Sequence, residues 1–269
     1  MLSALWHSWQ RSREDAAVRR RAIPDDLWKR TLVRYPFLRW RPPEDLLELR
    51  RLTSLFLDRK EFNAAGDLRL TNAIVVSIAA QAVLPVLKLG LARYDGFVGI
   101  VVHPDQVVAR RAVHDDDGLV HEYDETLSGE AVQGGPVMLS WRDVREGGRS
   151  AGYNVVIHEF AHVLDMADGQ SDGVPLLPSG LGRAAWLAVL QPEFDAFVQC
   201  VDVDADADTV LDPYGADGID EFFAVASESF FVDPHGLAAE HQALYKLLAT
   251  FYAQDPRAHA PAPPLQPGR

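Results

Sequence analysis

The sequence has little cysteine and no long uninterrupted apolar stretch. A single cysteine, Cys200, excludes a disulfide within the chain and fits a reducing compartment. The most hydrophobic segment, residues 73–92, is interrupted by Gln81, Pro85 and Lys88, so it falls short of the roughly 18–20 apolar residues that span a bilayer. The first residues also lack the apolar core of a secretory signal. We therefore expect a cytoplasmic protein without a membrane partner.

Positive charge is scarce as well. The net charge of the 269 residues is −13, which argues against direct nucleic-acid binding. Residues 1–51 are the exception, with 12 Lys and Arg against 7 Asp and Glu. The sequence shows neither an internal repeat nor a glycine-rich phosphate loop. The wide classes of nucleic-acid binders and nucleotide-binding enzymes are therefore disfavoured.

What the sequence does have is the pattern H-E-x-x-H, formed by His158, Glu159 and His162. Residues four apart in a helix lie on the same face, so both imidazoles can reach one metal ion. Glu159 projects close enough to act on a water bound to that ion. The pattern indicates a zinc site, although a short motif of this kind also arises by chance.

The residues around the motif favour a helix. Asn154 can cap its start, and Gly169 is a natural stop at its end. Between them lie apolar positions that suit a buried helix face: Val155, Val156, Phe160, Val163, Leu164 and Met166.

Most of the remaining chain reads as helical. A helix opened by Pro43 should run to about residue 62, and residues 62–70 read as a loop. Thr71 should cap an apolar helix that extends to about Leu89 and is kinked or ended near Pro85. Further helices are predicted at residues 184–200, 220–231 and 235–251.

Residues 97–141 have a different character and predict a small sheet. Short strands are expected at residues 97–102, 106–109, 119–122 and 137–141, with a turn at residues 115–118. The last of these strands is a candidate edge strand beside the metal helix. The fold class is therefore α+β, mainly helical, with a small β-sheet beside the H-E-x-x-H helix. We expect a basic flexible arm over residues 1–23, one domain over 24–255 and a disordered proline-rich tail over 256–269.

A catalytic zinc needs three protein ligands, so a third must be found. In the short-spacing pattern H-E-x-x-H-x-x-G-x-x-H, Asp165 stands where the glycine belongs and Asp168 where the third histidine belongs. In the alternative pattern the third ligand is a glutamate on a later helix. Glu221 stands at such a helix start, and Glu228, two turns further on, is a rival ligand or a partner of one.

Four stretches of the chain resemble the Mlc titration factor A family, a family of glucose-regulated bacterial zinc metallopeptidases whose catalytic region is similar to that of anthrax lethal factor. The stretches are RYDGFVGIVVHPDQVV (93–108), GGPVMLSWRDV (134–144), NVVIHEFAHVLDMADG (154–169) and YGADGIDEFFAVASESFF (214–231). The resemblance covers roughly residues 25–255 and implies a zincin-like fold.

The resemblance also implies roles for particular residues. The zinc ligands fall on His158, His162 and Glu221, for one Zn²⁺ per chain, and the general base falls on Glu159. A tyrosine near the zinc that steadies the transition state falls on Tyr214.

We therefore expect a zinc-dependent peptidase that hydrolyses a peptide or protein substrate, with aminopeptidase action as one form of it. The resemblance further implies a partner, a glucose-responsive transcriptional repressor that the family binds and inactivates. The alternative is a regulatory binding protein that titrates the repressor and in which the zinc is structural or only weakly catalytic. The substrate and the choice between amino- and endopeptidase action stay open.

Overall fold

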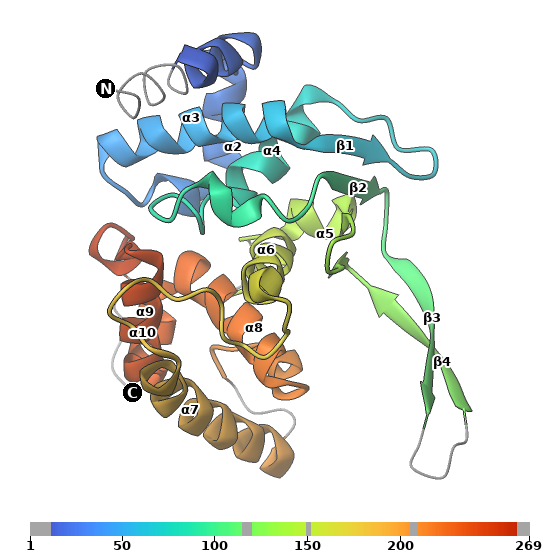
Figure 1. The fold of residues 1–269 in the computed structure, drawn as a ribbon, viewed down its shortest axis with the longest axis vertical. Coiled ribbons are helices and arrows are strands. Elements are labelled where there is room, and N and C mark those ends of the chain that lie inside the picture. The colour runs from blue at the N-terminus through green and yellow to red at the C-terminus, as the bar shows by residue number, and fades with distance from the viewer. Residues whose placement is uncertain (1–11, 115–119, 149–151, 205–208, 263–269) are drawn as a thin grey trace, which may run out of the picture.

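The helix that carries the H-E-x-x-H motif, α6 (Val155–Asp165), lies in the middle of the molecule. In the computed structural model, which describes residues 12–114, 120–148, 152–204 and 209–262, N-terminal helices and a sheet lie on one side of α6. The C-terminal helices lie on the other side, as Figure 1 shows. Helix α6 packs against α4, α8 and the short strand β5. The predicted class, α+β and mainly helical with a small sheet beside α6, is confirmed.

The N-terminal part is built from α2 (Asp25–Arg34), α3 (Pro43–Arg59) and α4 (Asn72–Ala82); the 3₁₀ turn η1 (Pro36–Arg39) joins α2 to α3, and a second one, η2 (Leu91–Tyr94), follows α4. Thr71 caps α4 as predicted, because its hydroxyl accepts a hydrogen bond from the amide of Ile74 at 3.3 Å. Of the two ends predicted for this helix, the one at Leu89 is wrong and the one near Pro85 is confirmed. The helix ends at Ala82, since Pro85 has no N–H to bond the Gln81 carbonyl and its ring would clash with that carbonyl.

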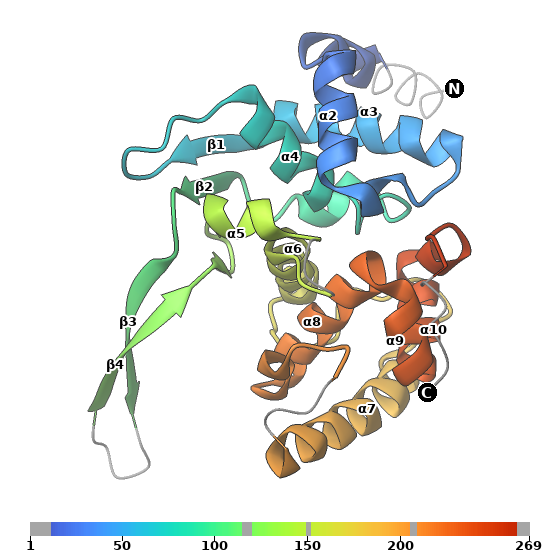
Figure 2. The same ribbon diagram turned by 180° about the vertical axis from the view of Figure 1, so that it is seen from behind.

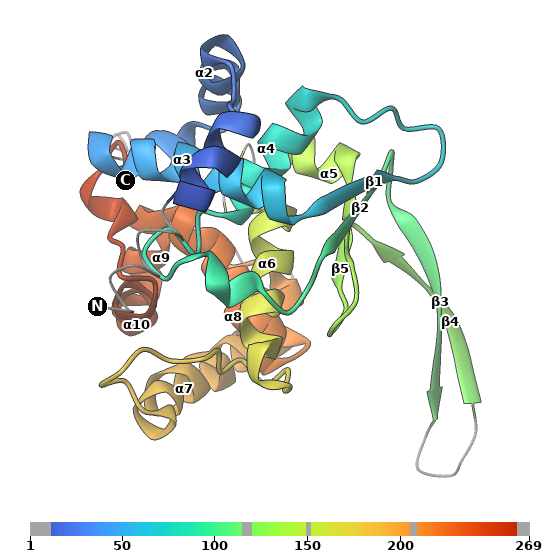
Figure 3. The ribbon, with the colours of Figure 1, turned by 45° about the horizontal axis from the view of Figure 1, so that its top comes forward.

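Four strands form the main sheet in the order β1-β2-β6-β5: β1 (Glu61–Ala64), β2 (Gly99–His103), β6 (Val137–Ser140) and β5 (Gly129–Ala131). Strands β1, β2 and β6 are parallel, and β5 runs antiparallel to β6. Figure 3 shows β5 beside α6. The sheet therefore presents β5 as the edge that faces the metal helix.

Strands β3 (Val107–His114) and β4 (Val120–Leu127) pair antiparallel in a separate two-stranded sheet. This hairpin projects from the body of the molecule, as Figure 2 shows. The turn predicted at 115–118 lies outside the described residues. The predicted strands at 106–109 and 119–122 therefore exist, but they are longer and belong to a different sheet from β2.

Three further predictions for this region are wrong. The strand at 137–141 is internal, between β2 and β5, so β5 is the edge beside α6. Residues 61–64, expected to contain the end of a helix and the start of a loop, form β1, because their backbone pairs with β2 although their side chains are mostly exposed. Trp141, the last residue of that predicted strand, instead begins the short helix α5 (Trp141–Glu146), which lies between β6 and α6 in the chain.

The C-terminal part contains α7 (Arg183–Val203), α8 (Ile219–Val232), α9 (Pro234–Glu240) and α10 (Gln242–Tyr252). Helix α8 is buried along its whole length from Phe222 to Val232 and packs directly on α6. The single helix predicted at 235–251 is two, because His241 leaves the helical region with φ −123° and ψ 59°. Burial of α8 against α6 fixes how the two halves of the molecule meet.

The chain ends differ from the predicted arm and tail where they are described. Residues 12–20 are helical, Ala17 is buried, and Glu14 pairs with Arg51 and Arg59 of α3. The 3₁₀ turn η5 (Pro256–Ala258) buries Pro256. Residues 1–11 and 263–269 lie outside the described residues, and the single domain at 24–255 stays a prediction. Among the helices that the structure describes, none is long and apolar enough to cross a membrane.

Candidate metal centre

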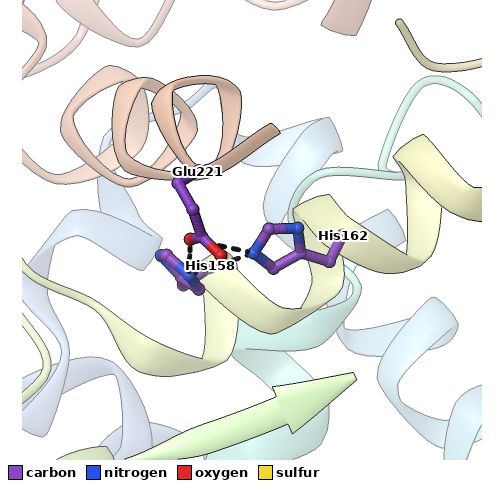
Figure 4. A group of neighbouring side chains, drawn as sticks. All are labelled: His158, His162 and Glu221. Atoms are coloured by element: carbon purple, nitrogen blue, oxygen red, sulfur yellow. Dashed lines mark hydrogen bonds and ion pairs between the residues drawn. The ribbon is translucent and has the colours of Figure 1, made fainter. Parts of the chain in front are cut away.

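Three side chains from two helices converge at the centre of the molecule. His158 and His162 project from the same face of α6, and Glu221 reaches them from the first turn of α8, as Figure 4 shows. The Nε2 atoms of the two imidazoles are 3.1 Å apart. Oε2 of Glu221 lies 3.1 Å from Nε2 of His158 and 3.3 Å from Nε2 of His162.

These distances fit one metal ion. Nitrogen and oxygen ligands lie about 2.0–2.1 Å from a tetrahedral zinc, which places any two of them about 3.3 Å apart. The observed separations of 3.1 to 3.3 Å are close to that value. Two imidazoles and one carboxylate are also the ligand set of a catalytic zinc, which leaves a fourth position open. The three residues therefore suit a catalytic zinc better than a closed structural one.

Electrostatics support the same arrangement. Burial raises the pKa of the Glu221 carboxyl, but hydrogen bonds with His158 and His162 outweigh burial and hold that pKa below its ordinary value. Glu221 also lies in the first turn of α8, where the positive end of the helix dipole favours a carboxylate. The charged form of Glu221 is therefore the stable one.

A buried chain of hydrogen bonds orients His158. Nδ1 of its imidazole lies 2.8 Å from Oε1 of Glu228, and because a carboxylate only accepts, the imidazole donates and keeps Nε2 free for the metal. The other Glu228 oxygen accepts from the backbone amide of Asn154. The Asn154 side chain caps α6 through the amide of Ile157 at 2.9 Å and donates to Gln81 Oε1 at 2.8 Å. The start of the metal helix and the orientation of its first ligand are thus fixed together.

Glu159 lies beside the three converging residues, with only 5 % of its surface exposed. Burial raises the pKa of its carboxyl to about 7, against the opposing effect of the two histidines. A carboxyl with a pKa near neutrality can both take and return a proton. The backbone of Gly129 in β5 lies directly against it: a Cβ atom built at residue 129 would fall 2.5 Å from Oε1 of Glu159.

Tyr214 also faces the centre. It lies on the 3₁₀ turn η4 (Pro213–Ala216), which Asp212 caps by accepting a hydrogen bond from the Tyr214 amide at 3.0 Å. The tyrosine ring is 5.9 Å from the His158 ring between centroids, and 44 % of the residue is exposed. Its side chain therefore reaches His158 from an exposed turn.

The rivals for the third ligand position lie elsewhere or act differently. Asp168 is exposed in the turn η3 (Met166–Asp168), and its carboxylate accepts from the Gln170 amide at 3.1 Å, outside the cluster. Asp165 is fully buried and accepts from the Gly173 amide at 2.9 Å. Burial raises the pKa of its carboxyl to about 6. Glu228 contacts Nδ1 of His158, whereas His162 and Glu221 lie at Nε2 of that ring.

Two adjoining cavities open at this centre. One, of about 260 Å³, touches His158, His162 and Glu221. The other, of about 220 Å³, extends towards Tyr153 and Val225. Both cavities share the same five lining residues: Leu127, Gly129, His158, Glu159 and Tyr214.

The sequence did not point to several residues of this centre. Gln81 and Gly129 come from parts of the chain that are distant from the motif, whereas Tyr153 is close to it. Burial raises the pKa of the Tyr153 phenol, which hydrogen-bonds to Ser128 in the wall of the smaller cavity. The one available signal was the position of Tyr153 directly before the helix cap.

The fold and the centre define the class: an H-E-x-x-H metallopeptidase in which a glutamate from a later helix converges on the two histidines. The sequence model of the family described as glucose-regulated metallo-peptidase M90 matches residues 6–253, and the chain belongs to this family.

Proteins from several bacteria are similar to this chain over most of their length. Mlc titration factor A of Pectobacterium atrosepticum is 35 % identical over 227 residues, which cover 84 % of this chain and 85 % of the relative. Mlc titration factor A of Klebsiella pneumoniae strain 342 is 35 % identical over 230 residues, 85 % of this chain and 86 % of the relative. An uncharacterised protein of Synechocystis is 32 % identical over 255 residues, 93 % of this chain and 90 % of the relative.

Proposed function

We propose that the protein is a zinc-dependent peptidase, with one zinc ion held by His158, His162 and Glu221. The observation that carries the proposal is the convergence of these three side chains, whose ligand atoms all lie within 4.8 Å of one another beside the buried Glu159. The family supports hydrolysis of a peptide bond. The single cysteine supports a cytoplasmic setting.

A zinc ion in this position would supply a Lewis acid that polarises the substrate carbonyl and lowers the pKa of water. Glu159 then has the position and the pKa to accept a proton from the attacking water and to pass it to the leaving amine. The phenol of Tyr214 can donate a hydrogen bond to the oxygen on which negative charge develops. Glu228 keeps the His158 ring in place throughout.

Replacement of the general base tests the proposal. Glu159→Gln should keep the zinc content near one per chain, because Glu159 is not a ligand, while peptide hydrolysis falls by at least about 100-fold. The zinc content is measured by atomic emission. Hydrolysis is measured with a peptide library, and protein treated with a chelator serves as the control. A variant that retains wild-type turnover would rule Glu159 out as the base. Free and acetylated amino termini in the library distinguish aminopeptidase from endopeptidase action.

A second candidate function is the binding of a repressor, which the name titration factor of the relatives supports. Under this proposal a transcriptional repressor protein is the partner, and binding is separable from hydrolysis. Glu159→Gln should then bind the repressor as the wild type does. If the variant loses repressor binding together with hydrolysis, the two functions share one surface.

A further inference from the structure

Three cavities lie in a row along one short segment of the chain. Residues 127–129 line the 220 Å³ pocket beside Tyr153, and residues 129–131 line the cavity at the metal ligands. Residues 132–134 line a third cavity, of about 510 Å³. Met166, at the end of the metal helix, borders both the second and the third cavities. The openings therefore follow strand β5 and its extension past the metal centre on both sides.

The third cavity is an apolar groove, which we call the upstream groove. Arg93, Gln133 and Asp168 also line this cavity, but its large side chains are mostly apolar: Phe97, Val132, Val137, Val163, Met166 and Leu176. Val132 is 47 % exposed and Leu176 is 43 % exposed, so these side chains face the solvent. An apolar surface that is exposed and continuous with a reaction centre is suited to hold part of a substrate.

Strand β5 supplies the backbone against which a peptide can lie. It is the last strand of its sheet, and within the described residues no strand pairs with its outer side. An extended peptide can add to such an edge by main-chain hydrogen bonds, and antiparallel pairing is the more stable form. A peptide antiparallel to β5 begins near residue 134 and ends near residue 127.

We infer, on the basis of the proposed peptidase function, that the protein cleaves internal bonds of extended peptides and that the upstream groove binds apolar residues on the amino-terminal side of the cleaved bond. The bond itself lies beside Glu159, next to Gly129. The residue after the bond enters the pocket of about 220 Å³, which exceeds the roughly 150 Å³ that encloses a benzene ring. Both sides of the bond thus have a place in the cleft.

Exposed valines inside and outside the groove allow a matched test. Val132→Asp puts a charge into the groove, and Val98→Asp puts the same charge at a valine that is 58 % exposed and lines none of the three cavities. Both sites are exposed, so both variants should fold. Their zinc contents and melting temperatures, compared with those of the wild type, check this. The substrates are acetylated alanine hexapeptides with Leu or Asp two residues before the cleaved bond, and mass spectrometry locates that bond.

Zinc-loaded wild-type protein should cleave the acetylated peptides internally and prefer Leu over Asp by about tenfold or more in kcat/KM. Val132→Asp should reduce that preference at least about fivefold, whereas Val98→Asp leaves it unchanged. The inference is overturned if only peptides with a free amino terminus are cut, or if the preference survives Val132→Asp.

Binding separates this inference from the proposed function. A fluorescein-labelled Leu hexapeptide is titrated into two zinc-loaded proteins. One is the Glu159→Gln variant, and the other carries Val132→Asp in addition. A Val132-dependent affinity without any hydrolysis by the wild type supports the groove and contradicts the peptidase. Hydrolysis without a Val132-dependent affinity supports the peptidase and contradicts the groove.

Discussion

Gly129→Ala provides the sharpest test of the reaction centre, because it alters neither a metal ligand nor the general base. A Cβ atom at residue 129 would meet three atoms of Glu159, with Oε1 at 2.5 Å and both Cδ and Cγ at 2.7 Å. Ordinary van der Waals contact begins at 3.4 Å, so the carboxylate has to shift by about 0.9 Å. Rotation of the carboxylate alone does not remove the clash, since Cγ is also in contact.

The expected result is a loss of catalysis with the metal retained. A displacement of about 1 Å in a catalytic group can lower the rate about 100-fold, so kcat/KM should fall by roughly that factor. Zinc content should stay near that of the wild type, because the three atoms nearest to the added Cβ all belong to Glu159, which is not one of the three proposed ligands. Overpacking of this kind costs about 1–3 kcal/mol of stability, which a urea titration measures.

Gly99→Ala is the matched control. Gly99 is also a strand glycine, in β2 of the same sheet, and a Cβ atom there would lie 3.6 Å from its one near neighbour, Pro136. This variant should keep activity within about twofold, because nothing has to move. If Gly129→Ala is as active as Gly99→Ala, the contact between β5 and Glu159 does not position the base.

Other variants test the ligands and their supports. Glu221→Gln should lose most zinc and nearly all activity, whereas Asp168→Asn stays close to the wild type; the reverse result, read by zinc analysis, would restore the short-spacing pattern. Glu228→Gln should lower zinc affinity about 10–100-fold, and an unchanged affinity would show that its bond to the histidine is dispensable. Asn154→Ala should lower the free energy of unfolding by about 2–4 kcal/mol in urea, because it removes a helix cap and a buried hydrogen bond; a loss below about 0.5 kcal/mol would contradict this. The pKa of Asp165 is raised to about 6 from 3.8, so the folded wild-type protein loses stability as pH rises from about 4 to 6. The free energy of unfolding of Asp165→Asn, measured relative to that of the wild type, should therefore increase by about 2–3 kcal/mol from pH 4 to pH 7. Equal pH profiles of unfolding for the two proteins would disprove that account.

The metal helix could be predicted because its signals are local. Asn154 caps it by the expected hydrogen bond, and the chain turns at Gly169 with φ 98°. Both depend on residues within one turn of the helix ends. The same kind of local signal predicts Thr71 at the start of α4. The end of that helix is set by Pro85, which interrupts an apolar stretch that otherwise continues to Leu89.

The sheet could be predicted only in outline. Strand β1 is short and largely exposed, so it has no alternation of apolar side chains to reveal it. Which strand forms the edge depends on pairing between segments that are distant in the chain, and no period in the sequence encodes it. The role of Gly129 is of the same kind. Only the packing of β5 on α6 shows that a side chain there would strike Glu159.

Glu221 lies between these two cases. From its position at a helix start, the sequence alone allows a solvated carboxylate that merely interacts with the helix dipole. In the structure Glu221 lies both at the helix start and beside the two histidines. It reaches them, 59 residues after His162, because α8 is buried against α6. A carboxylate there is kept charged by the helix end and by the imidazoles before any metal arrives. The candidate metal centre is thus assembled by the packing of two helices, and Glu221 is brought to it by the fold rather than by its neighbours in sequence.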